Sequence, residues 1–231
     1  AGTVTVTAVG YNLTLSTKAS ATTTFSGTIS NNSTNLLYLV VNGSGTQALN
    51  GTNSFYGTTT VSGGTLSLGT NLTNNSAVTV NGGTLTSSAS NINLGVGGVS
   101  MSSGSISPRG TGATGTFTLA ANQNFTATGG TLSFNIGTAL DQIKGSGTGS
   151  FGLSGTTTLD LTLGTGFAYT STYQLFSGFS SGSVSGLTIT GYDTANWLAA
   201  LGTDGVLSFS AAPVPEPSTF ALLTGAAFFG L

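Results

Sequence analysis

The sequence predicts an all-β protein, and three observations support that prediction. Short segments in which apolar and polar residues alternate recur over residues 1–210, which is the period of a β-strand. Gly-Gly pairs followed by Thr-Leu recur at a spacing near twenty residues, which indicates a stacked repeat. Only 3% of the residues are charged, while the hydrophobic fraction is 38%. We therefore expect a folded parallel β-helix with a β-rich C-terminal cap and a short apolar helix at the C-terminus.

The Gly-Gly repeat is the main evidence for stacking. Val61–Leu68, Val80–Thr86 and Ala127–Phe134 share it, and the first two pairs begin at Gly63 and Gly82, one repeat length apart. Glycine supplies a turn with positive φ, and the Thr-Leu segment after it forms a short strand. One such unit cannot bury its apolar face alone, so the units must stack. We expect these residues to point into the core: Val61, Leu66, Leu68, Val78, Val80, Leu85, Ile92, Leu94, Phe117, Leu119, Phe125, Leu132 and Phe134.

Changes of pattern divide the chain into four parts. Residues 1–152 form the repeat body and residues 153–210 a β-rich cap that covers its end. Residues 211–217 form a proline-rich linker, which is extended and stiff. The tail, residues 214–231, overlaps this linker.

One short helical turn is expected within the cap. The segment Asp193–Leu201 contains it, with Asp193 or Thr194 as its N-cap.

The last residues combine a short motif with an uncharged apolar run. The motif is Val214, Pro215, Glu216, Pro217 and Ser218. The fourteen residues from Ser218 to Leu231 would span about 21 Å as a helix, against about 30 Å of membrane hydrocarbon. The residues expected to contact the membrane are Phe220, Ala221, Leu222, Leu223, Phe228, Phe229 and Leu231.

Two segments resemble known families. Leu49–Gly69 resembles the autotransporter-associated β-strand repeat, and Val214–Ser218 with its apolar run is similar to the PEP-CTERM sorting signal. The family tail ends in an arginine cluster, which does not occur up to Leu231, so either the sequence stops short of the true C-terminus or this copy of the signal is defective, and we expect the former. A sequence that begins at Ala1 is expected to have lost a signal peptide or to be a fragment.

These resemblances imply an exported protein of a Gram-negative bacterium. It would be anchored transiently in the inner membrane through its tail, processed by an exosortase-type membrane enzyme, and then located at the cell surface or in the extracellular matrix with exopolysaccharide. The leading hypothesis is therefore a structural or adhesive biofilm-matrix protein. The alternative is an extracellular polysaccharide-binding module that uses exposed aromatic residues.

Composition excludes several kinds of chemistry. Three basic residues cannot neutralise a nucleic-acid backbone, so we expect no nucleic-acid partner. The chain has no histidine and no cysteine, and we expect no catalytic residue, no metal and no cofactor. The remaining carboxylate hypothesis concerns Asp141 and Asp160, which lie one repeat length apart and could be neighbours in a stack. Such a pair would suit a polysaccharide hydrolase or lyase or a calcium ion, whereas the other interpretation is two solvated turn residues.

Aromatic and threonine patterns give two further hypotheses. Tyr56, Tyr173 and Trp197 could contact sugars, or they could fill corners of the fold. The Thr-x-Thr runs at Thr3–Thr7 and Thr156–Thr158 are similar to flat ice-binding faces, although threonine also favours strands for conformational reasons.

Overall fold

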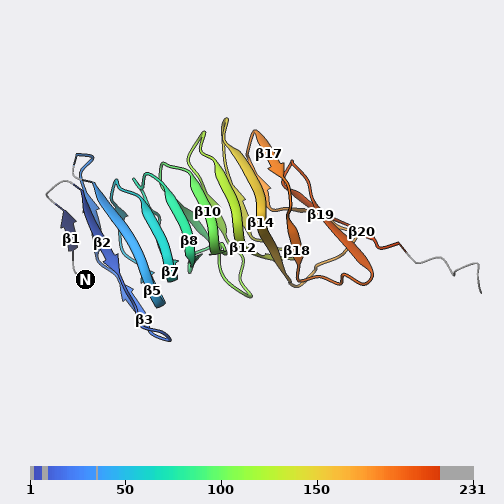
Figure 1. Cartoon of the computed structure of the whole chain (residues 1–231), viewed down its shortest axis with the longest axis horizontal. Coiled ribbons are helices and arrows are strands. Elements are labelled where there is room, and N and C mark those ends of the chain that lie inside the picture. Colours follow the sequence, from blue (N-terminus) through green and yellow to red (C-terminus); the bar gives the residue numbers. More distant parts are fainter. Residues whose placement is uncertain (1–2, 7–9, 35, 214–231) are drawn as a thin grey trace, which may run out of the picture.

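The structure is a computed structural model, and it describes residues 3–6, 10–34 and 36–213. Over these residues the chain is all-β, without a helix, and most of its strands pair in parallel. Figure 1 shows the strands side by side along the long axis of the molecule.

A ten-stranded sheet forms the largest face. Its main path runs β17-β14-β12-β10-β8-β7-β5-β2, while β18 pairs with β14 and β3 pairs with β5. The strands of this sheet are β2 (Tyr11–Leu15), β3 (Thr22–Phe25), β5 (Leu37–Leu49), β7 (Thr59–Leu68), β8 (Val78–Ser87), β10 (Val99–Ile106), β12 (Phe125–Ile136), β14 (Ser150–Leu163), β17 (Ser181–Val184) and β18 (Thr188–Thr190).

Three smaller sheets complete the fold. Two of them are parallel, with the orders β1-β4-β6 and β16-β13-β11-β9, and the third, β15-β20-β19, is antiparallel. Their strands are β1 (Thr3–Val6), β4 (Thr28–Asn31), β6 (Asn53–Ser54), β9 (Asn91–Asn93), β11 (Thr116–Thr118), β13 (Gln142–Lys144), β15 (Tyr173–Gln174), β16 (Phe176–Ser177), β19 (Trp197–Leu201) and β20 (Val206–Ala211).

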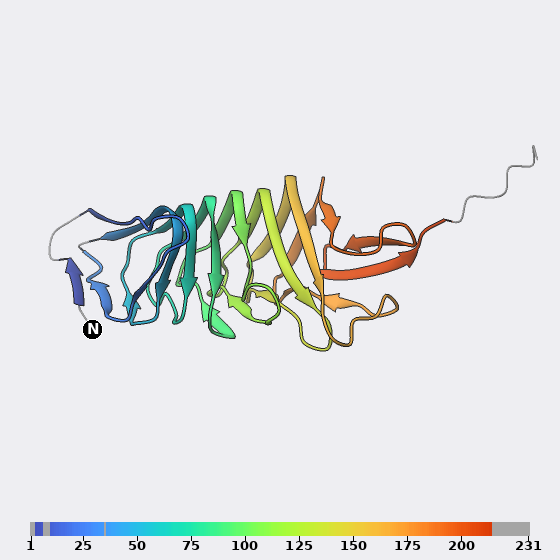
Figure 2. The ribbon, with the colours of Figure 1, turned by 90° about the horizontal axis from the view of Figure 1, so that it is seen from below.

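The pairing register reproduces the sequence repeat. Val61 lies opposite Val80 and Leu66 opposite Leu85, so β7 and β8 pair at the same offset that separates their Gly-Gly pairs in the sequence. Parallel pairing continues through β14 with β17 and β18, past residue 153, where the sequence pattern changes. The antiparallel sheet lies at the C-terminal end of the stack in Figure 2.

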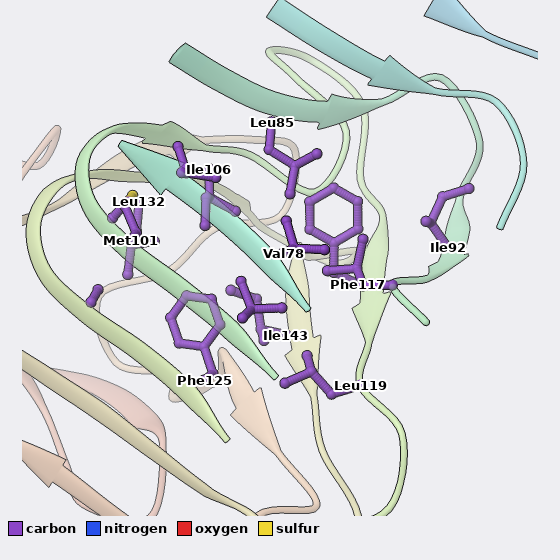
Figure 3. Close-up of a cluster of buried hydrophobic side chains, with 14 of the residues drawn as sticks. Val78, Leu85, Ile92, Met101, Ile106, Phe117, Leu119, Phe125, Leu132 and Ile143 are labelled. Carbon is purple, nitrogen blue, oxygen red and sulfur yellow. The ribbon is translucent and has the colours of Figure 1, made fainter. Parts of the chain in front are cut away.

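The core lies between the ten-stranded and the smaller parallel sheets. Every residue predicted to point inward is buried, with an exposed fraction of at most 1%. Figure 3 shows Val78, Leu85 and Phe125 of the large sheet facing Ile92 and Phe117 of the four-stranded sheet. Met101, 1% exposed, belongs to the same cluster.

The Gly-Gly pairs lie within strands instead of forming turns between them. β7 and β8 run through their glycines, and the register of β5 against β7 shifts at this point. Gly64 has a φ of +60°, and a Cβ there would lie 2.5 Å from the carbonyl oxygen of Gly45. Gly130 repeats this arrangement, with a φ of +85° and 2.7 Å to the Gly104 oxygen. Glycine is therefore required because each strand bends closely against its neighbour.

The short helical turn predicted within Asp193–Leu201 is limited to residues 194–196, where the Trp197 amide donates to the Asp193 carbonyl at 3.1 Å, and it does not extend into a helix. Residues 194–196 make a hydrogen-bonded turn, and Trp197–Leu201 is strand β19. Asp193 caps the turn as expected, since its carboxylate accepts from Ala195 N at 3.1 Å and Asn196 Nδ2 at 2.8 Å. Residues Trp197–Leu201 are extended because β19 pairs with β20 along its whole length. The predicted C-terminal helix lies outside the described residues.

Candidate functional site

The sorting motif, Val214 to Ser218, and the membrane-contacting residues of the tail lie outside the described residues. The structure does describe the segment that leads to them. β20 ends at Ala211, and the Ala212 amide donates to the Asn196 carbonyl at 2.8 Å. The chain is thus held against the antiparallel sheet until shortly before Val214. Within the described part of the chain, no helix has the length and hydropathy that a membrane crossing requires.

Asp141 and Asp160 do not form a carboxylate pair. Asp160 lies on β14 between the buried Leu159 and Leu161, so its side chain points away from the core. Its carboxylate accepts a hydrogen bond from the Thr190 hydroxyl at 2.7 Å. Asp141 is instead fully buried. The stacking hypothesis fails because Ser133 of β12, and not Asp141, lies opposite Asp160 in the register of the sheet.

Asp141 belongs to a buried hydrogen-bond network. One carboxylate oxygen accepts from Gly115 N at 2.6 Å, and the other accepts from the amide and the side chain of Asn135 at 2.8 and 2.7 Å. Burial raises the pKa of Asp141, while these N–H donors and the charge of Arg109 oppose that rise. The carboxylate oxygens are therefore engaged by the protein itself.

Asn135 connects this carboxylate to the loop before β11. Its side-chain nitrogen donates to the carbonyl oxygens of Gly110 at 2.6 Å and Ala113 at 2.8 Å, and its oxygen accepts from Gly112 N at 2.9 Å. The arrangement fixes the loop over residues 110–115 and leaves Asn135 only 7% exposed. Its chemistry is that of a structural clamp.

A shallow depression lies beside this clamp. It is lined by residues 112–114, 135, 136, 138, 139 and 162–165. Asp141 is not among its lining residues, and no other carboxylate is. The depression thus offers no acid or base to a ligand.

Over the residues that the structure describes, no three histidine, cysteine, aspartate or glutamate side chains gather as a metal site would require. Two further acids serve turns: the Asp204 carboxylate accepts from Val206 N at 3.1 Å, and Asp193 caps the turn before β19. The Asn196 side chain, which donates to Asp193, lowers the pKa of that exposed carboxyl.

The three predicted sugar contacts do not share a face. Tyr173 is only 4% exposed, and its hydroxyl donates to the Ala168 carbonyl at 3.0 Å, so the prediction of an exposed ring is wrong there. Tyr56 is 36% exposed and lies between β6 and β7. Trp197 lies on β19 of the antiparallel sheet, at the C-terminal end of the stack (Figure 2).

Trp197 instead belongs to an aromatic cluster in the antiparallel sheet. Its ring stacks on Tyr169 with centroids 4.6 Å apart and planes 5° from parallel. Phe209 packs edge-on against Tyr169 at 5.2 Å. Trp197 and Tyr169 are both partly exposed. They form a stacked, partly exposed aromatic pair at this end of the molecule.

Comparison with known proteins finds no matching family model, no matching curated protein and no matching solved structure.

Proposed function

We propose that this chain is an exported, non-catalytic structural or adhesive protein of the bacterial cell surface or biofilm matrix. In this proposal the body is a parallel β-helix, and the tail at Val214–Ser218 is recognised and processed by an exosortase-type membrane enzyme. Before processing, the tail would anchor the protein in the inner membrane, and exopolysaccharide would be its neighbour in the matrix.

The order of the parts carries the proposal. Parallel strands stack along one axis, the antiparallel sheet follows, and its last strand β20 ends at Ala211, close to Val214. A tail that leaves from the C-terminal end would place the stacked body away from the membrane. The body presents few charges and a repeated polar face, which suits a spacer more than a catalyst.

The sorting motif is tested with the full chain in a host that contains an exosortase-type enzyme. Deletion of residues 214–231 should release an unprocessed protein. Replacing Pro215, Glu216 and Pro217 together by alanine keeps the apolar run, so this variant should remain with the membrane at its unprocessed mass. The measurement is cell fractionation with mass spectrometry. If the triple variant is processed like the wild type, the motif has no sorting role and the proposal is rejected.

A second candidate function is polysaccharide binding, which the parallel Tyr169–Trp197 stack favours. Flat aromatic faces with a polar edge suit the apolar faces of sugar rings. Pull-down with the producer's own exopolysaccharide should weaken strongly in Trp197→Ala. Tyr56→Ala, a partly exposed aromatic far from the cluster, is the matched control and should bind normally. Equal binding by both variants and the wild type would reject this function.

A further inference from the structure

One column of hydroxyl side chains crosses the ten-stranded sheet without interruption. Each member lies directly opposite the next in the pairing register, over eight neighbouring strands. We call this set the threonine column: Thr22, Thr46, Thr65, Thr84, Ser105, Thr131, Thr158 and Thr188.

The threonine column faces solvent. Its members precede or follow inward-pointing residues, such as Leu66 beside Thr65 and Leu85 beside Thr84, so their own side chains point outward. None of them is buried, and the two at the ends of the column are exposed. On several strands a second hydroxyl follows two positions later and widens the surface, as at Thr24, Ser67, Ser133 and Thr190.

The column is kept although the connecting segments differ in length. One repeat length separates Thr65 from Thr84, whereas a much longer segment connects Thr158 to Thr188. Strand propensity alone does not account for it, because the four-stranded sheet of the same molecule has different outward residues. They are Asn91, Asn93, Thr116, Thr118, Gln142, Lys144 and Ser177.

The spacing of the column is close to a spacing in ordered water. Paired strands lie about 4.8 Å apart, so neighbouring members of the column repeat at about that distance along the sheet. In tetrahedrally bonded water, two oxygens that share a neighbour lie about 4.5 Å apart, given O–H···O distances of about 2.75 Å. The mismatch between the two spacings is therefore about 0.3 Å per strand. Two strands away from a central strand, in either direction, it has grown to only about 0.6 Å. Around Thr84, the strand spacing of five members of the column thus matches that of ordered water within this limit.

The low charge of the sheet and the threonine side chains are also compatible with ordered water as the ligand. Asp160 is the only charged residue on the strands of the ten-stranded sheet that the structure describes, and the Thr190 hydroxyl binds it at 2.7 Å. Charged groups hold their own hydration water, which conflicts with an imposed lattice. Threonine adds a methyl group beside each hydroxyl, and its stiff χ1 fixes both. No aromatic residue lies in the column to stack on a sugar.

We propose that the threonine column is an ice-binding surface, whose ligand is the ordered water of an ice crystal. This surface lies on the ten-stranded sheet, and it does not depend on the tail or on the function proposed above. It differs from the Thr-x-Thr runs visible in the sequence, because its members come from eight separate strands and meet only through the pairing register.

The test measures thermal hysteresis and ice recrystallisation of the full chain. The wild type should separate the melting and freezing points and keep ice grains small. Thr84→Lys, and separately Thr65→Lys, should abolish both effects because a long charged side chain holds the crystal away from its neighbours. Thr116→Lys on the four-stranded sheet is the matched control and should retain full activity. Circular dichroism melting of every variant verifies that the fold is intact.

Three results would overturn the proposal. The first is a wild type without effect on ice. The second is an equal loss of activity in Thr116→Lys and Thr84→Lys. The third is binding of the wild type to crystalline cellulose or chitin through the threonine column with no effect on ice, which would assign the surface to a glycan.

Discussion

Replacing Phe176 by alanine tests how the C-terminal part of the core is stabilised. The ring is 1% exposed and lies among three others: Phe151, stacked at 4.7 Å and 14°, Phe125 at 5.6 Å and Phe134 at 5.7 Å. Truncation of a buried phenylalanine costs about 3–5 kcal/mol through lost burial and a new cavity. Each aromatic pair adds about 0.5–1.5 kcal/mol beyond burial, and the three pairs share one ring, so they are not additive.

Phe55→Ala is the matched control for this prediction. Phe55 is equally buried at 1%, and among the described residues it has no aromatic ring partner. We therefore expect Phe176→Ala to lower the free energy of unfolding by about 1.5–3 kcal/mol more than Phe55→Ala does. Urea unfolding followed by far-ultraviolet circular dichroism and by the fluorescence of Trp197, the only tryptophan, measures the difference. A loss in Phe176→Ala no greater than in Phe55→Ala would refute the view that the rings contribute beyond burial.

Two further predictions concern backbone contact and pH. A Cβ on Gly97 would lie 1.3 Å from the Ser76 carbonyl oxygen, whereas a Cβ on Gly152 meets only the rotatable Ser183 hydroxyl at 3.3 Å. Gly97→Ala should therefore melt well below the wild type, and Gly152→Ala should melt at or slightly above it; equal melting temperatures would contradict this close approach. Burial raises the pKa of Asp141 above its ordinary value of 3.8, so the folded state retains this proton where the unfolded state has lost it. The stability of the wild type relative to Asp141→Asn should thus be greatest below pH 3.8 and should decline as pH rises through the pKa of Asp141 in the folded state. If the melting temperature of the wild type minus that of Asp141→Asn instead grows with pH, the raised pKa is refuted.

Much of the strand pattern was predictable because it depends on local alternation. Leu66 and Leu85 point inward for the same reason: after each Gly-Gly bend, every second side chain of the strand faces the core. The offset between β7 and β8 followed from the repeat alone. The stacked parallel sheets agree with the expected fold class, while the β-helix itself stays part of the proposal.

The errors concern contacts that are made only in the folded chain. Asp141 and Asp160 are one repeat length apart, but β12 and β14 pair at an offset of 27 residues (160 − 133), so that Ser133 and not Asp141 lies opposite Asp160. Tyr173 has a polar hydroxyl and was predicted to be exposed, yet the rings of Phe167 and Phe209 pack against it and it is buried. The predicted turn before Trp197 does not continue as a helix, because β19 pairs with β20, which only the folded chain places beside it. The role of Asn135 had no signal in the sequence.

The burial of Met101 has a chemical consequence. Methionine and cysteine are the side chains that peroxide attacks most readily, and this chain has one methionine and no cysteine. The single sulfur lies on β10, between Val80 and Ala127 of the adjacent strands, and is closed off from solvent. The folded molecule therefore offers oxidants almost nothing to react with, and the gain of one oxygen atom in its mass would report that β10 has been exposed.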